Sequence, residues 1–146
     1  MKIGFNMLLW TPFVTEEHFA LLPKLKATGY DGVEVPLFAG DVPHYKNVAK
    51  AIRDNGLKCT TCTVIPDEER NPISADPQHR QGGVDYLKWA IDCNAALGSE
   101  VLCGPFYQPL GGKFFSGKGP TQEEKDRAVE VHRKAADFAK QANLQL

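Results

Sequence analysis

The chain lacks both a long hydrophobic run and an excess of charge of either sign. Among its 146 residues, 17 lysines and arginines face 18 aspartates and glutamates, so the formal net charge is −1. No apolar run approaches the roughly 20 residues that a membrane-spanning helix needs, and the first ten residues lack a signal-peptide cleavage pattern. We therefore expect a cytoplasmic protein. Neither nucleic acid nor a membrane is an expected partner, because both attract basic surfaces.

Cysteine is too sparse for a disulfide-rich scaffold. The four cysteines, Cys59, Cys62, Cys93 and Cys103, lie within apolar strand and helix patterns, which predicts reduced thiols. Cys59 and Cys62 have the C-x-x-C spacing of redox and zinc sites, but they fall inside a predicted strand. Side chains three residues apart on a strand point to opposite faces, so we expect neither a disulfide nor a metal site there.

Common catalytic and phosphate-binding motifs are missing as well. The four histidines are scattered, with no H-E-x-x-H motif and no pair spaced i, i+4 that could gather a metal. Neither G-x-G-x-x-G nor G-x-x-x-x-G-K-[ST] occurs, and the glycines at 111–112 and 117–119 lack the strand-to-helix context of a phosphate loop.

What is present is one strand-loop-helix unit repeated four times. Apolar runs at 2–10, 32–38 and 58–65 predict the first three strands, and EVLCGPFYQPLGG at 100–112 predicts a fourth strand that delivers a loop. A helical pattern follows each strand. In the second helix the spacing i, i+3, i+4 and i+7 places Tyr45, Val48, Ala49 and Ile52 on one face before Gly56.

Helix boundaries carry clear local signals. Thr15 caps the first helix and Gly29 ends it, while Asp76 followed by proline begins the third helix after a polar loop at 66–75. Thr121 and Glu124 form a capping box at the start of the fourth helix, which Asn143 can close. The segment 114–120 is a glycine-bearing loop.

Four strands alternating with four helices predict an α/β fold with a parallel sheet and outer helices. Two architectures are open at this point. A small doubly wound sheet would be complete at this length, whereas a (β/α)8 TIM barrel needs about 250 residues. The apolar residues 144–146 begin another strand, which favours four units of a barrel. We therefore expect residues 1–146 to be the N-terminal half of a single TIM-barrel domain, ending at the start of strand 5.

Glu34 is the most informative single residue in these patterns. A carboxylate within VEVPLF needs a partner or water, which a site at the barrel mouth would supply. A structural ion pair is the alternative interpretation. Asn6, Trp10, Phe13 and Phe106 lie near strand ends, where barrel enzymes build their active sites.

Several segments together resemble the D-tagatose and D-psicose (allulose) 3-epimerases of the sugar phosphate isomerase/epimerase group. They are KIGFNMLLW, TGYDGVEVPLF, DNGLKCTTCTVIP with its NPIS loop, and GSEVLCGPFYQPLG. The resemblance covers the whole chain but only the first half of the family's xylose isomerase-like TIM barrel.

The resemblance implies a ketose as the small-molecule substrate and proton transfer through an enediolate. The family holds a divalent metal (manganese, magnesium or cobalt) through two glutamates, an aspartate and a histidine on strands five to eight. These positions lie beyond Leu146, so we expect no catalytic residue, no metal ligand and no bound metal in this chain. The chain alone would be inactive. What it would contribute is the sugar-binding wall: Asn6, Trp10, Phe13, Glu34, Ile65 and Phe106. Asn6 stands where family members often have an aromatic residue.

Two other functions fit parts of the sequence. Endonuclease IV-like DNA repair proteins share the superfamily, but they need zinc-binding histidines and a basic surface that this chain lacks. A non-catalytic half-barrel could instead serve as a binding or assembly module. Whether the chain is half of an epimerase or a binding module, the open sheet edges of a half-barrel predict self-association.

Overall fold

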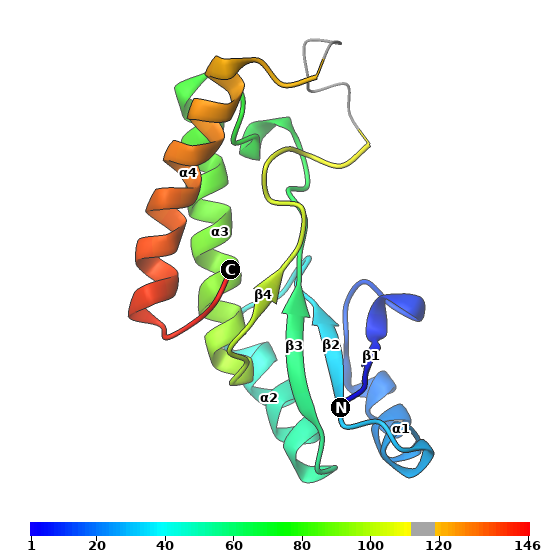
Figure 1. The fold of residues 1–146 in the computed structure, drawn as a ribbon. Helices are drawn as coiled ribbons and strands as arrows, with labels where there is room; N and C mark the ends of the chain where they lie inside the picture. Colours follow the sequence, from blue (N-terminus) through cyan, green and yellow to red (C-terminus); the bar gives the residue numbers. More distant parts are fainter. Residues whose placement is uncertain (112–118) are drawn as a thin grey trace.

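The computed structural model describes residues 1–111 and 119–146, so the predicted loop at 114–120 lies mostly outside the described residues. Figure 1 shows four strands side by side, each followed by a helix. The strands are β1 (Gly4–Asn6), β2 (Gly32–Pro36), β3 (Lys58–Cys62) and β4 (Leu102–Cys103). The helices are α1 (Leu22–Thr28), α2 (Val42–Asp54), α3 (Pro77–Leu97) and α4 (Gln122–Gln141).

The sheet is parallel throughout and its strands follow the order β1-β2-β3-β4. In a doubly wound sheet the strand order reverses once, which sends helices to both faces. Here every crossover steps in the same direction, so right-handed connections place all the helices on one face. This topology is that of a barrel segment, and it decides between the two architectures that the sequence left open.

The first unit differs most from its prediction. The strand covers only Gly4–Asn6, and the rest of the apolar run 2–10 turns into the short 3-10 helix η1 (Met7–Leu9). The predicted strand was therefore too long. The Asn6 side chain accepts a hydrogen bond from the Leu8 backbone N–H at 2.8 Å, which stabilises the turn in place of a strand.

The helix after that strand begins as a 3-10 helix, η2 (Glu16–Leu21), before continuing as α1. Thr15 lies at its N-terminus as predicted, and the Thr15 backbone N–H donates to His18 Nδ1 at 3.1 Å. Gly29 ends α1 with a φ of 104°, a left-handed conformation that glycine adopts without steric cost.

The second and third units follow the sequence analysis, although β2 ends two residues and β3 three residues earlier than predicted. The four predicted apolar residues of α2 are all buried, and Asp41 caps this helix. A short 3-10 helix, η3 (Glu68–Arg70), interrupts the polar loop before α3. The Asp76 carboxylate accepts from the Gln78 N–H at 2.8 Å, and Gly98 closes α3 in the left-handed conformation.

The fourth unit has the shortest strand, with only two residues in β4. The capping box of α4 forms as predicted: Thr121 Oγ1 accepts from the Glu124 N–H at 3.2 Å, and the Thr121 N–H donates to the Glu124 carboxylate at 2.6 Å. After α4, Gln145 pairs with Val101 in an isolated parallel bridge beside β4.

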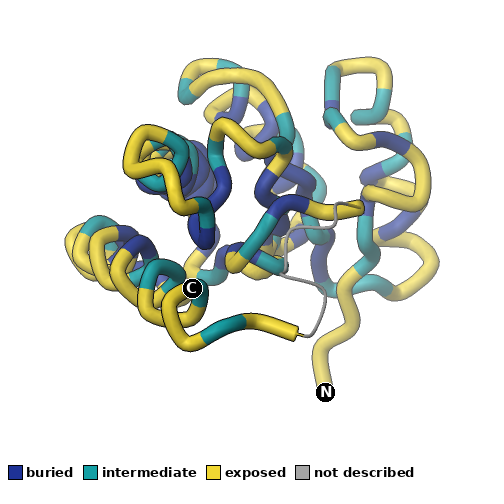
Figure 2. The backbone as a smooth tube through the Cα atoms, turned by 90° about the horizontal axis from the view of Figure 1, so that it is seen from above, coloured by how far each residue is buried: buried dark blue, intermediate teal, exposed yellow. Residues whose placement is uncertain are grey.

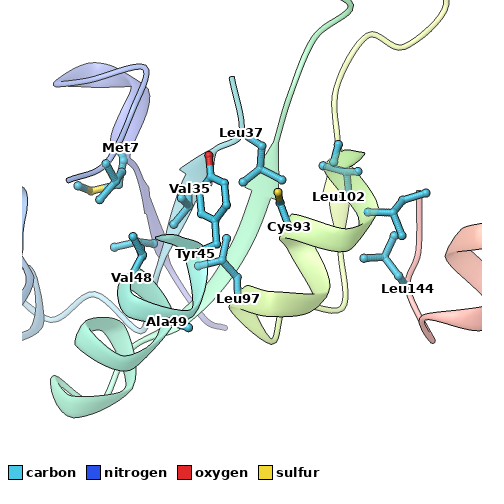
Figure 3. Packing of buried hydrophobic residues seen from close by; sticks show 14 of the residues in the cluster. Met7, Val35, Leu37, Tyr45, Val48, Ala49, Cys93, Leu97, Leu102 and Leu144 are labelled. Carbon is cyan, nitrogen blue, oxygen red and sulfur yellow. The ribbon is translucent and has the colours of Figure 1, made fainter. Parts of the chain in front are cut away.

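The hydrophobic core lies between the sheet and its helices (Figure 3). Val35 and Leu102 point from the strands into this layer, and Tyr45 and Leu97 meet them from α2 and α3; all four are buried. Figure 2 shows buried backbone concentrated in the sheet and on the inner sides of the helices. Among the described residues, no helix is both long and apolar enough to cross a membrane.

Candidate functional site

A polar cluster occupies the face of the sheet opposite the helices, centred on the half-buried Glu34. Asn6 Nδ2 donates to Glu34 Oε1 at 2.7 Å. The Thr60 hydroxyl and the Cys103 thiol both approach Glu34 Oε2, at 3.5 Å and 3.4 Å. One carboxylate is thus contacted from three other strands: β1, β3 and β4.

Strand register explains this convergence. Asn6 is the register partner of Glu34, and Glu34 is the partner of Thr60, so the three side chains leave the sheet on the same side. Val33 and Val35, on either side of Glu34 in the chain, point the other way and are buried against the helices. Glu34 therefore faces the inner surface that a closed barrel would enclose.

The partners of Glu34 are neutral groups: an amide, a hydroxyl and a thiol. Among the ion pairs within residues 1–111 and 119–146, none includes Glu34. The described residues therefore hold the carboxylate by hydrogen bonds and not by a structural ion pair.

Cys62 and Cys103 lie next to each other on this same face. They are register partners on β3 and β4, and both interact with the Glu34 carboxylate. Burial raises the pKa of the Cys62 thiol to about 12, with smaller contributions from the charge of Glu34 and the neighbouring Cys103. Desolvation also raises the pKa of Cys103 to about 11, and its hydrogen bond to Glu34 adds to the shift. Both thiols are protonated at neutral pH.

Trp10 and Phe13 lie in the loop between β1 and α1. The Trp10 ring stacks on Phe5 with centroids 4.3 Å apart, and 49% of the tryptophan is exposed. Phe13 stacks on His44 at 4.5 Å, and the His44 ring nitrogen Nε2 is 2.9 Å from the Val14 carbonyl oxygen. Trp10 therefore offers an exposed ring surface in the loop after β1, whereas Phe13 is engaged in local packing.

Ile65 and Phe106 are placed in the core. Ile65 is 0% exposed and Phe106 is 7% exposed. The backbone of Ile65 forms a parallel bridge with Pro109, which ties the loop after β3 to the loop after β4. Gly104 permits this approach, because a Cβ there would lie 1.9 Å from the Thr63 carbonyl oxygen. These two apolar residues therefore pack in the core beneath the loops after β3 and β4.

The histidines serve local structure. His132 Nδ1 is 2.7 Å from the Ala128 carbonyl oxygen, and His79 lies between Glu68 and Asp76, at 3.4 Å and 3.9 Å. Within the part of the chain that the structure describes, no three acidic, histidine or cysteine side chains gather in a way that could hold a metal ion. The described residues therefore offer no side-chain cluster that fits a divalent metal.

Two cavities lined by described residues are centred outside the polar cluster, although Thr60 also lines the first of them. One, of about 340 Å³, is at the amino ends of β3 and β4, beside Arg53, Lys58 and Glu100. The other, of about 490 Å³, lies between the loop after β2 and α3, beside Gly40 and Trp89. The polar cluster is part of an open sheet face.

Sequence analysis missed two partners of Glu34, namely Thr60 and Cys103. The sequence carries a partial signal for Thr60: strand alternation predicts that Thr60 and Cys62, two residues later, lie on the same face of β3. No sequence pattern indicates that Cys103 reaches the same carboxylate oxygen as Thr60, since that depends on the register of β3 against β4.

Comparison with known proteins places this geometry in context. A family model described as a xylose isomerase-like TIM barrel matches residues 22–146. The fold is similar to that of D-psicose 3-epimerase from Clostridium cellulolyticum H10, solved with D-tagatose, at a TM-score of 0.82 and 20% identity. It is also similar to D-allulose 3-epimerase from Methylomonas sp. in complex with D-allulose (TM-score 0.84, 21% identity) and to L-ribulose 3-epimerase (0.83, 24%).

These likenesses cover nearly all of this chain but half of the other proteins. The matches include 99%, 99% and 100% of this chain, and 50%, 49% and 48% of the three solved chains. The chain thus spans about half the length of the solved structures that it matches. No curated protein sequence matches it significantly.

Proposed function

The chain belongs to the xylose isomerase-like TIM barrel family, and from that premise we propose that residues 1–146 form the N-terminal half of a metal-dependent ketose 3-epimerase or sugar isomerase. The observation that carries the proposal is the Glu34 cluster. It lies on the inner sheet face, beside the residues where β1, β3 and β4 end. TIM-barrel enzymes bind their substrates at the carboxyl ends of the strands.

The proposed role of this half is to bind the sugar. The Glu34 carboxylate can accept hydrogen bonds from sugar hydroxyls, and the remaining N–H of the Asn6 amide can donate one. The exposed face of Trp10 suits the apolar C–H surface of a sugar. Phe13, Ile65 and Phe106 complete the proposed wall by supporting the loops, since Ile65 and Phe106 have little or no exposed surface.

The reaction class proposed for the whole enzyme is proton transfer at a carbon next to a carbonyl group. The described residues contain no cluster that fits a divalent metal, so the proposal assigns metal binding and the acid and base residues to the other half of the barrel. The part played by this chain is to orient the hydroxyl groups of the ketose.

The test begins with the reading frame that follows the codon for Leu146. If the frame continues, the full-length product should epimerise a ketose at C3 in an assay of D-fructose, D-tagatose and L-ribulose with manganese. Glu34→Gln should raise KM about 10- to 150-fold, because a hydrogen bond to a charged acceptor contributes about 1.5–3 kcal/mol. Glu130→Gln is the matched control, since Glu130 is an exposed glutamate on α4 that forms an ion pair with Lys134.

Two results would reject the proposal. One is an absence of ketose turnover by a folded full-length product. The other is a stop codon after Leu146, which would favour the non-catalytic half-barrel module.

A further inference from the structure

The two thiols on the inner sheet face form a pair that the proposed sugar wall does not require. Cys62 and Cys103 are register partners on adjacent parallel strands. Neighbouring strands lie about 4.8 Å apart, and side chains at paired positions project in the same direction. The shared carboxylate of Glu34 confirms that both sulfur atoms are on the same side of the sheet.

This geometry suits a bridge of one atom better than a direct bond. A disulfide requires two Cβ atoms that approach each other, typically to within about 3.8 Å. Side chains that stand parallel on neighbouring strands keep their Cβ atoms farther apart than that. A single large atom between the two sulfurs spans the gap without moving the strands.

We propose that Cys62 and Cys103 form a vicinal dithiol site that binds trivalent arsenicals at the carboxyl end of β3 and β4. The chemistry balances without an oxidant. An arsenic oxide, R–As=O, reacts with two thiols to give R–As(S–Cys)₂ and one water molecule. Two As–S bonds form, the As=O bond and two S–H bonds break, both thiol protons leave in the water, and arsenic remains trivalent.

The surroundings favour this ligand over anionic or alkylating reagents. Both thiols are protonated at neutral pH, because burial and the Glu34 carboxylate oppose thiolate formation. The arsenic oxide removes each thiol proton as it binds, so it needs no preformed thiolate. Cys103 is exposed and gives access to the pair, while the largely buried Cys62 supplies the second sulfur.

The other two cysteines provide internal controls. The Cys59 thiol lies on the helix side of the sheet, 3.6 Å from the Leu97 carbonyl oxygen, to which it donates. Cys93 is 0% exposed within α3. Neither has a second thiol as a register partner in the sheet.

The experiment titrates the reduced chain with phenylarsine oxide. Native mass spectrometry should find one phenylarsenic group per chain, and calorimetry should give the affinity. In the unmodified chain the second As–S bond forms intramolecularly, which raises the affinity. Cys103→Ser removes that second bond, so it should weaken binding about 100-fold or more. Cys59→Ser and Cys93→Ser should bind as the unmodified chain does. The adduct should be reversed by 2,3-dimercaptopropanol and should resist an equal thiol concentration of glutathione.

Cys103→Ser is the decisive variant, because Cys103 is exposed and its replacement leaves the core intact; circular dichroism checks the fold. Undiminished binding by folded Cys103→Ser, or no binding by the unmodified chain with four free thiols, would overturn the proposal. The measurement needs no sugar, so its result is independent of the proposed function.

Discussion

Glu34 is held at the open face of the sheet by hydrogen bonds from three different strands. Asn6 contributes the shortest, at 2.7 Å, and the same Asn6 side chain caps η1 through the Leu8 N–H. A single amide thus links the carboxylate to the loop that carries Trp10. A change at Asn6 would affect both the orientation of Glu34 and the position of the loop.

The first prediction concerns the reactivity of Cys103. Its pKa of about 11 lies above that of an ordinary thiol near 8.5, so less thiolate is present at any pH below 11. Iodoacetamide at pH 8 should alkylate Cys103 roughly ten times more slowly than a cysteine in an unstructured peptide, despite its exposure. The rate should rise steadily as the pH approaches 11, as measured by peptide mapping.

Glu34→Gln provides the comparison for that prediction. The substitution removes the negative charge beside the thiol, so the pKa of Cys103 should fall and alkylation at pH 8 should accelerate. A rate that levels off by pH 9 in the unmodified chain would contradict the raised pKa.

At the scale of the elements, local capping decides where the helices begin. Thr121 and Glu124 satisfy each other's free backbone N–H groups at the start of α4. A helix N-terminus otherwise leaves its first N–H groups without intrahelical partners. The start of α4 is therefore determined by residues that are only three positions apart in the chain.

The second prediction tests this cap. Thr121→Ala should lower the free energy of unfolding by about 1 kcal/mol, because the Glu124 N–H loses its acceptor. Thr121→Ser keeps the hydroxyl and should stay close to the unmodified chain. Urea unfolding measures both variants. A loss of only a few tenths for Thr121→Ala would mean that the cap contributes little to the stability of α4.

At the scale of the whole molecule, the sheet of residues 1–146 has two borders. On one side, within the part of the chain that the structure describes, β1 pairs only with β2, and on the other Gln145 pairs with Val101 beside β4. Ile3 is 51% exposed next to β1. An exposed strand edge with apolar neighbours is a template for pairing with another chain.

The third prediction is that residues 1–146, prepared as an isolated polypeptide, self-associate through these borders. Ile3→Lys should reduce the mass measured by light scattering, because charge on an edge strand opposes pairing. Val129→Lys is the matched control, since Val129 is similarly exposed, at 46%, but lies on α4. A monomer at high concentration would contradict the prediction.

The same sample should not epimerise any ketose with manganese. Turnover would contradict the assignment of the catalytic residues to the other half of the barrel.

The sequence by itself determined the helices and the order of the units, because those features depend on residues close together in the chain. Asp76, Thr121 and the glycines at 29 and 98 act within one turn of their helices. The apolar spacing of α2 likewise predicted its buried residues correctly. An α/β fold with parallel strands followed from this alternation.

Only the tertiary structure decided the strand lengths and which side chains contact Glu34. A continuous apolar run at 2–10 fits a strand, but Leu8 and Leu9 are exposed in a 3-10 turn, and the contact between Asn6 and Leu8 stabilises that turn. The burial of Ile65 and the meeting of Cys62, Cys103 and Glu34 depend on how β2, β3 and β4 are aligned. That alignment joins residues up to 69 positions apart, and local sequence patterns carry no information over such separations, because register is set by packing of the whole sheet against its helices.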